Sequence, residues 1–132
     1  MQEYSLEPIP SYTGTLLTKL PRELRKELRE YHTYCDIDVY IVHHHAYNSL
    51  VFEGIASLPL INIEPGAIRR FLSSIKQGKG DRLRFGHGYT MAHQWGQLTI
   101  LRLSEQGIPI ESLPIPLCTR VIAGLLDAER FA

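Results

Sequence analysis

The spacing of apolar residues along this chain changes between two periods, and these changes limit the fold more than any single motif does. Apolar and polar residues alternate over residues 36–42, which is typical of a half-buried strand. Over residues 66–76 the apolar residues instead recur at intervals of three and four, as they do on one face of a helix. The same order of strand-type and then helix-type patterns returns between residues 81 and 130.

Short connections separate the strand-type segments, so we expect neighbouring strands to pair antiparallel. Separate groups of strands and helices favour an α+β domain with a mostly antiparallel sheet, an N-terminal helix and two further helices. Residues 58–63 form a short apolar connection that could pair as a further strand, and residues 107–109 are expected to be a connection. The other strands are expected over residues 36–42, 50–55, 81–87, 89–95 and 98–103, and the helices over residues 21–31, 64–78 and 116–130.

Two four-residue segments suggest that the chain contains two similar halves. Ser57-Leu58-Pro59-Leu60 and Ser112-Leu113-Pro114-Ile115 lie 55 residues apart, and each follows strand-type segments and precedes a helix-type segment. The match predicts a pseudo-repeat of residues 36–78 and 81–130, with chance similarity as the alternative. We therefore expect an extended N-terminal arm over residues 1–16 and a single globular domain over residues 17–132.

The N-terminal helix carries a resemblance to a known family. Leu20-Pro21-Arg22-Glu23-Leu24, followed by Leu28 and Tyr31, resembles the opening helix of an F-box, a motif that recruits an adaptor of ubiquitin ligases. The resemblance also implies a viral source, because such openings occur in proteins of large DNA viruses. It covers residues 17–31 only, and the strand expected over residues 36–42 departs from the further helices of an F-box. The same residues also make a good start for any amphipathic helix.

Composition excludes several classes of protein. Apolar residues make up 44% of the 132 residues, which is typical of a globular domain, and no apolar run is long enough to predict a membrane span. The N-terminus has no apolar signal segment, so we expect an intracellular protein, cytoplasmic or nuclear, or a component of a virion. Cys35 and Cys118 lie far apart and are expected to be reduced thiols, with a long-range disulfide as the alternative.

The net charge is zero, with 14 Lys and Arg against 14 Asp and Glu, but the charges are unevenly distributed. Residues 30–68 contain five acidic residues and no Lys or Arg, whereas residues 69–84 contain six basic residues and only Asp81. This basic segment predicts binding to nucleic acid or another anion, with aromatic residues next to it for base stacking. A solvated helix face, or pairing with the acidic segment of a second copy, is the alternative. The candidate residues are Arg69, Arg70, Lys76, Lys79, Arg82, Arg84, Phe85 and Tyr89.

Histidines are the candidates for metal binding. His43 and His45 fall on the same face of a strand that includes both, and His87 and His93 could complete a zinc site. The spacing matches no established metal motif, and the alternative is a polar strand end that enters a turn.

The sequence favours a protein without catalytic activity over an enzyme. It contains no Gly-x-Ser-x-Gly motif, and neither cysteine lies in a catalytic signature. We therefore expect a protein–protein interaction or structural protein that self-associates as a homo-oligomer and has no membrane segment. The alternatives are a nucleic-acid-binding module that uses the basic segment and a His-ligated metalloenzyme.

Overall fold

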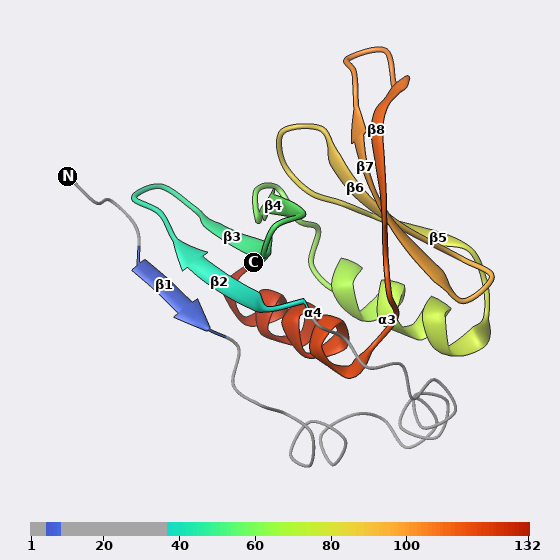
Figure 1. Ribbon diagram of the computed structural model, residues 1–132, viewed down its shortest axis with the longest axis horizontal. Coiled ribbons are helices and arrows are strands. Elements are labelled where there is room, and N and C mark those ends of the chain that lie inside the picture. The colour runs from blue at the N-terminus through green and yellow to red at the C-terminus, as the bar shows by residue number, and fades with distance from the viewer. Residues whose placement is uncertain (1–4, 9–36) are drawn as a thin grey trace.

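The computed structural model describes residues 5–8 and 37–132, which form two four-stranded antiparallel sheets and two helices (Figure 1). In each sheet the strands pair in the order in which they occur in the chain. The first sheet consists of β1 (Ser5–Pro8), β2 (Val39–His43), β3 (Asn48–Phe52) and β4 (Ala56–Pro59), and it is followed by α3 (Ala67–Gln77). The second sheet consists of β5 (Asp81–Arg84), β6 (Tyr89–Gln94), β7 (Gln97–Leu103) and β8 (Pro109–Ile115), and it is followed by α4 (Thr119–Phe131).

This arrangement confirms the predicted α+β class and the mostly antiparallel sheet. The third predicted helix, over residues 21–31, lies outside the described residues, as do the F-box-like segment and Cys35. Residues 5–8 of the expected N-terminal arm pair with β2 as the edge strand β1. The connection expected over residues 107–109 is followed by a strand that was not predicted, since β8 begins at Pro109 and pairs with β7.

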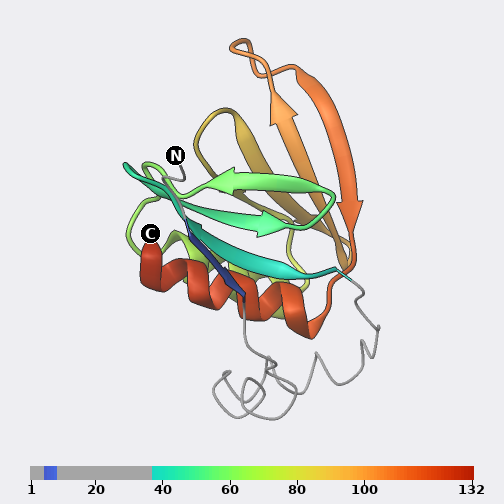
Figure 2. The same ribbon diagram turned by 60° about the vertical axis from the view of Figure 1, so that its left-hand side comes forward.

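Each helix packs mainly on the sheet that does not precede it. The helix α4 follows the second sheet in the chain but contacts β2 and β3 of the first sheet, whereas α3 follows the first sheet and contacts β5 of the second. The two helices also contact each other. Figure 2 shows α4 running along the first sheet, while the hairpin of β7 and β8 extends away from the helices. The two halves therefore share one core.

That core contains the apolar residues of both sheets and both helices. Phe52 and Phe71 are its largest fully buried side chains, from β3 and α3 respectively. In α3 the four residues spaced three and four apart are all buried, as the periodicity predicts, and the helix ends at Gly78 in a left-handed conformation (φ 68°). Those four residues are Ile68, Phe71, Leu72 and Ile75.

A backbone contact also joins the two sheets directly. The Gly86 N–H, in the turn after β5, donates a hydrogen bond of 3.0 Å to the Pro59 carbonyl at the end of β4. A Cβ atom at Gly86 would lie 2.9 Å from the Ile61 Cβ atom, so only glycine fits this approach. The contact holds the segment between β4 and α3 close to β5.

The packing of α4 on β2 allows a first prediction. A Cβ atom at Gly124 would lie 2.5 Å from the Val39 Cγ1 atom, which is too close for any side chain. Gly124→Ala gains about 1 kcal/mol of helix propensity, but it forces α4 away from a stiff β-branched side chain. We expect a net loss of about 1–3 kcal/mol in the free energy of unfolding, measured by urea denaturation.

Gly80→Ala is the matched control, because a Cβ atom there would lie 3.5 Å from the His93 carbonyl oxygen, an ordinary contact distance. The control is expected to change the free energy of unfolding much less than Gly124→Ala does. Equal effects of the two substitutions would contradict the close packing of α4 on β2.

Candidate functional site

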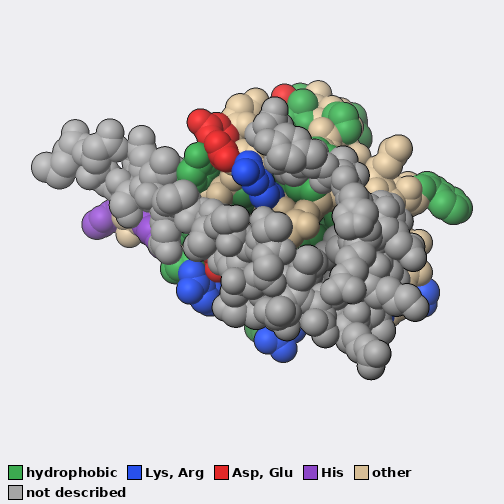
Figure 3. Space-filling view, turned by 60° about the horizontal axis from the view of Figure 1, so that its bottom comes forward, with side chains coloured by type: hydrophobic (Ala, Val, Ile, Leu, Met, Phe, Trp, Pro, Cys, Tyr) green, Lys and Arg blue, Asp and Glu red, His purple; other side chains and the backbone are tan. Residues whose placement is uncertain are grey.

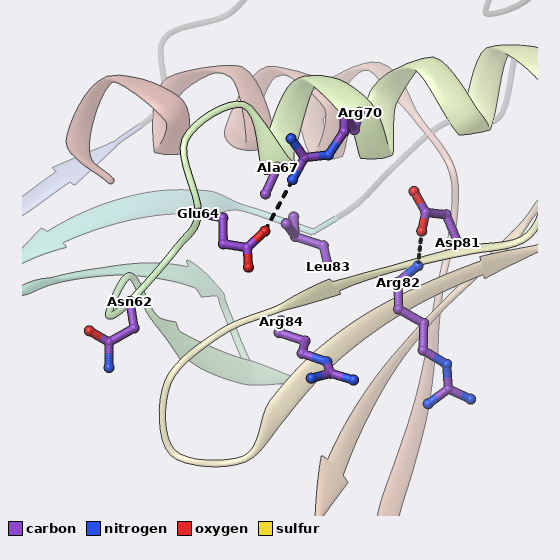
Figure 4. Close-up of a pocket in the computed structure, with 8 residues that line it drawn as sticks. All are labelled: Asn62, Glu64, Ala67, Arg70, Asp81, Arg82, Leu83 and Arg84. Carbon is purple, nitrogen blue, oxygen red and sulfur yellow. Dashed lines mark hydrogen bonds and ion pairs between the residues drawn. The ribbon is translucent and has the colours of Figure 1, made fainter.

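A pocket of about 470 Å³ lies between the start of α3 and the strand β5 (Figure 4). Three arginines line it, together with two acidic residues. The pocket has the size of a small-molecule or short-segment binding site, and its lining is mostly polar. The lining residues are Asn62, Glu64, Ala67, Arg70, Asp81, Arg82, Leu83 and Arg84.

The positive charge of Arg70 is already paired within the chain. Its Nη2 atom lies 3.3 Å from the Glu64 Oε2 atom, and its Nη1 donates a hydrogen bond of 3.4 Å to the Pro65 carbonyl. Both side chains are mostly exposed, so the pair adds little stability. It does show that the acidic segment of residues 30–68 and the basic segment meet within one molecule.

Arg82 and Arg84 occupy alternate positions of β5 and therefore lie on the same face of the second sheet. Both are exposed, whereas Leu83 between them is buried on the opposite face. Figure 4 shows both arginine side chains directed away from α3. Within residues 37–132, neither guanidinium group forms an ion pair. These two charges are therefore available to a ligand.

The backbone of β5 also faces the pocket. Among the described strands β5 lies at an edge, where it pairs with β6 alone. The Phe85 N–H donates to the Tyr89 carbonyl (2.8 Å), so the peptide group of Phe85 points towards β6. In an antiparallel pair the peptide groups of alternate residues point towards the partner strand, so those of Leu83 also face β6 and those of Arg82 and Arg84 point away from it. The Arg82 N–H is satisfied by the Asp81 Oδ1 atom at 2.8 Å.

The other candidate anion-binding residues lie elsewhere. Arg69 forms an ion pair with Glu129 of α4 and so joins the two helices. Lys76 and Lys79 lie at and just beyond the end of α3 and do not line the pocket. In Figure 3 the visible Lys and Arg side chains lie at several separate places rather than in one patch.

The two candidate stacking residues are on the wrong face for the arginines. Phe85 is buried in the core with 7% of its surface exposed. In the register of β5 and β6, Arg84 lies opposite Thr90, so Tyr89 belongs to the opposite face, where the Arg102 guanidinium lies 5.7 Å from its ring centre. The structure thus brings together Arg70, Arg82 and Arg84 and separates them from both aromatic rings.

The four candidate zinc ligands occupy different surroundings. The His43 Nδ1 atom lies 2.9 Å from the Asn48 Oδ1 atom, and His45 is exposed in the following turn. His87 is exposed in the turn between β5 and β6, whereas His93 is buried with its Nδ1 atom 3.1 Å from the Lys79 carbonyl oxygen. In the described part of the chain, no three His, Cys, Asp or Glu side chains form a group that could hold a metal ion. The described residues do not bring the four histidines together, and the zinc site remains a prediction from the sequence.

A second exposed surface lies at the other edge of the same sheet. Ile108 and Ile110, at the tip of the β7–β8 hairpin and the start of β8, have 62% and 66% of their surface exposed. The Leu103 N–H donates to the Gly88 carbonyl, so the peptide groups of Ser112 and Pro114 face outward from β8. Pro114 has no N–H to offer, which limits further pairing along this edge.

Neither surface as a whole is evident from the sequence. Ile108 lies in the connection expected over residues 107–109, and no local pattern shows that the side chains of Ile108 and Ile110 remain exposed. Asn62 and Glu64 line the pocket together with Asp81 of β5, because the Gly86–Pro59 contact brings residues 59–64 next to this strand. Only the alternation of Arg82 and Arg84 could have been recognised from the sequence.

Comparison of the chain with family models, with curated proteins and with solved structures found no match. No helix in the described residues is long and apolar enough to cross a membrane. The function is therefore inferred from the geometry of the two edges of the second sheet.

The side chain of Tyr40, in β2, allows a prediction about pH. Burial raises the pKa of Tyr40 above its ordinary value of 10.0, and the nearby carboxylates of Glu53 and Asp38 raise it further. Because the folded protein holds this proton more tightly than the unfolded chain does, Tyr40 contributes stability below about pH 10 that is lost as the pH rises through the raised pKa.

We therefore expect the free energy of unfolding to fall more steeply above pH 10 in the wild type than in Tyr40→Phe, as measured by urea denaturation across this range. Spectrophotometric titration of the tyrosines should show that the substitution removes an ionisation above pH 10. Loss of an ionisation at or below pH 10 would contradict the assigned environment of Tyr40.

Proposed function

We propose that this chain is a non-catalytic protein–protein interaction protein that self-associates through the β8 edge of its second sheet. The observation that carries the proposal is the exposure of Ile108 and Ile110 on a hairpin that extends away from the helices. Exposed apolar side chains next to a free strand edge favour contact with another protein surface.

A second copy of the chain is the simplest partner for this edge. Antiparallel contact of β8 with β8 of a second copy is two-fold symmetric, so each copy contributes the same residues. The outward peptide group of Ser112 can pair with its counterpart, while Pro114 keeps the ladder short. Most of the contact then comes from the isoleucines, and we expect a small interface and a weak, concentration-dependent association.

Nucleic-acid binding by the basic segment is supported less well. The candidate residues divide between the pocket, an ion pair with α4 and the end of α3, and both candidate aromatic residues lie away from Arg82 and Arg84. A face that binds single-stranded nucleic acid combines basic residues with stacking rings, and one that binds a duplex gathers several basic residues along its phosphates. The exposure of Ile108 and Ile110 supports apolar contact with a protein at β8 better than the dispersed basic residues support nucleic-acid binding.

The test is the molar mass in solution measured by light scattering over a range of protein concentrations. We expect a mass that rises from the monomer value of 15.1 kDa towards twice that value. Ile110→Asp places a charge in the apolar contact, so this variant should remain at 15.1 kDa at every concentration.

Trp95→Asp is the matched control. Trp95 is the most exposed large apolar residue within residues 37–132, at 84%, but it lies in the turn between β6 and β7, at the end of β7 opposite to the hairpin tip. This variant should associate as the wild type does. The proposed interface would be refuted if the wild type stayed monomeric at all concentrations. It would also be refuted if Trp95→Asp lost association while Ile110→Asp kept it.

A further inference from the structure

The edge of the second sheet formed by β5 differs in chemistry from the edge formed by β8. At β8 the exposed side chains include the apolar Ile110 next to Glu111 and Ser112, whereas at β5 they are those of Arg82 and Arg84, next to the outward peptide groups of the same two residues. A segment that pairs along the β5 edge therefore meets these backbone groups and, on the face of the sheet directed away from α3, the two guanidinium groups.

The charge of this pocket favours an anionic ligand. Of its five charged residues, Arg70 and Glu64 pair with each other, and the Asp81 carboxylate accepts a hydrogen bond from the Arg82 N–H but keeps its negative charge, so three arginines against two carboxylates give the lining a net charge of +1. This leaves the positive charges of Arg82 and Arg84 without a partner in the described part of the chain.

The start of α3 adds to the positive potential of the pocket. Ala67, the first residue of α3, lines the pocket, and the helix has no capping side chain and no acidic residue in its first turn. The N-terminus of a helix carries a partial positive charge that favours a nearby anion. The start of α3 lies beside Glu64 on the side of the pocket opposite to β5, whose arginine side chains are directed away from the helix.

We propose that the pocket along β5 binds an extended acidic peptide segment, which adds to the second sheet as a further strand. The peptide groups of Arg82 and Arg84 would pair with the backbone of the segment, as in other complexes formed by strand addition. The Asp81 carboxylate marks the position at which a carbonyl oxygen of the segment takes over the hydrogen bond from the Arg82 N–H.

The spacing of the arginines sets the sequence preference. Arg82 and Arg84 are two residues apart on one face, about 7 Å along the strand, and alternate residues of an added strand have the same spacing. Acidic side chains at alternate positions of the segment would therefore lie opposite the two guanidinium groups, at the distance of cross-strand neighbours. A guanidinium group can meet a carboxylate through two parallel hydrogen bonds, which makes such a contact directional.

A peptide agrees with this surface better than a nucleic acid does. Single-stranded nucleic acid binds by stacking its bases on exposed aromatic rings as well as by contacts to phosphates. The aromatic residues next to β5 are Phe85, which is buried, and Tyr89, which lies on the face opposite to Arg82 and Arg84. The pocket offers backbone pairing instead of stacking.

The test is fluorescence anisotropy of a short labelled peptide of alternating Glu and Thr residues, added to the full-length protein. We expect saturable binding that weakens as salt is added, because the contacts are between exposed charges. Arg82→Gln and Arg84→Gln should each lower the affinity by about tenfold, since each removes one charge-assisted pair.

Lys79→Gln is the matched control variant. Lys79 is exposed, and its replacement by Gln removes one positive charge, as the arginine substitutions do. Because Lys79 does not line the pocket, this variant should bind the peptide with wild-type affinity. A peptide of alternating Glu and Pro residues is the matched control ligand, because it keeps the charges but cannot pair as a strand. It should bind at least about tenfold more weakly than the Glu–Thr peptide.

Hydrogen exchange gives a second measurement that does not depend on the variants. Binding of the Glu–Thr peptide should slow exchange of the Arg84 amide, which faces the pocket, and leave the Leu83 amide unchanged, since that amide faces β6. Equal binding of the Glu–Pro peptide, unchanged exchange at Arg84, or binding of oligo(U) RNA but not of the peptide would each overturn the proposal.

This inference is independent of self-association through β8, because the two surfaces lie on opposite edges of the second sheet. Ile110→Asp should therefore abolish association and keep peptide binding, while Arg84→Gln should keep association and lower the affinity for the peptide by about tenfold. The two proposals can fail separately in these measurements.

Discussion

The contact between α4 and β2 is the constraint on which the rest of the structure depends. Gly124 lets the helix backbone approach Val39 so closely that no side chain could stand between them. Because α4 comes from the end of the chain and packs on the first sheet, the second sheet must fold back to bring it there. The core therefore closes only when both halves are present, which makes the two sheets and the two helices one cooperative unit.

This arrangement decides which parts of the second sheet remain open. The helices contact β2, β3 and β5, and the hairpin of β7 and β8 extends away from them. β5 and β8 stay at the two edges of the sheet, and their exposed groups differ: arginines at β5 and isoleucines at β8. A sheet with two chemically different free edges can contact two different partners, and both proposals rest on this property.

Much of the fold could be predicted because periodicity is a local property. The alternation over residues 36–42 and the three- and four-residue spacing in α3 each depend on neighbours in the sequence, and both elements formed, each beginning three residues later than expected, at Val39 and Ala67. The segments Ser57–Leu60 and Ser112–Ile115 also take corresponding places, at the fourth strand of each sheet. The site was predicted less well, because the basic segment has no periodicity that shows which charges are paired with distant residues.

The sequence by itself determined the alternation of strands and helices, the buried face of α3 and the shared face of Arg82 and Arg84, since these follow from the geometry of a single strand or helix. Only the tertiary structure decided that Arg69 pairs with Glu129, that Arg82 and Arg84 do not form ion pairs within residues 37–132, and that Phe85 is buried. Those outcomes depend on how segments far apart in the chain pack, and packing is a property of the whole core.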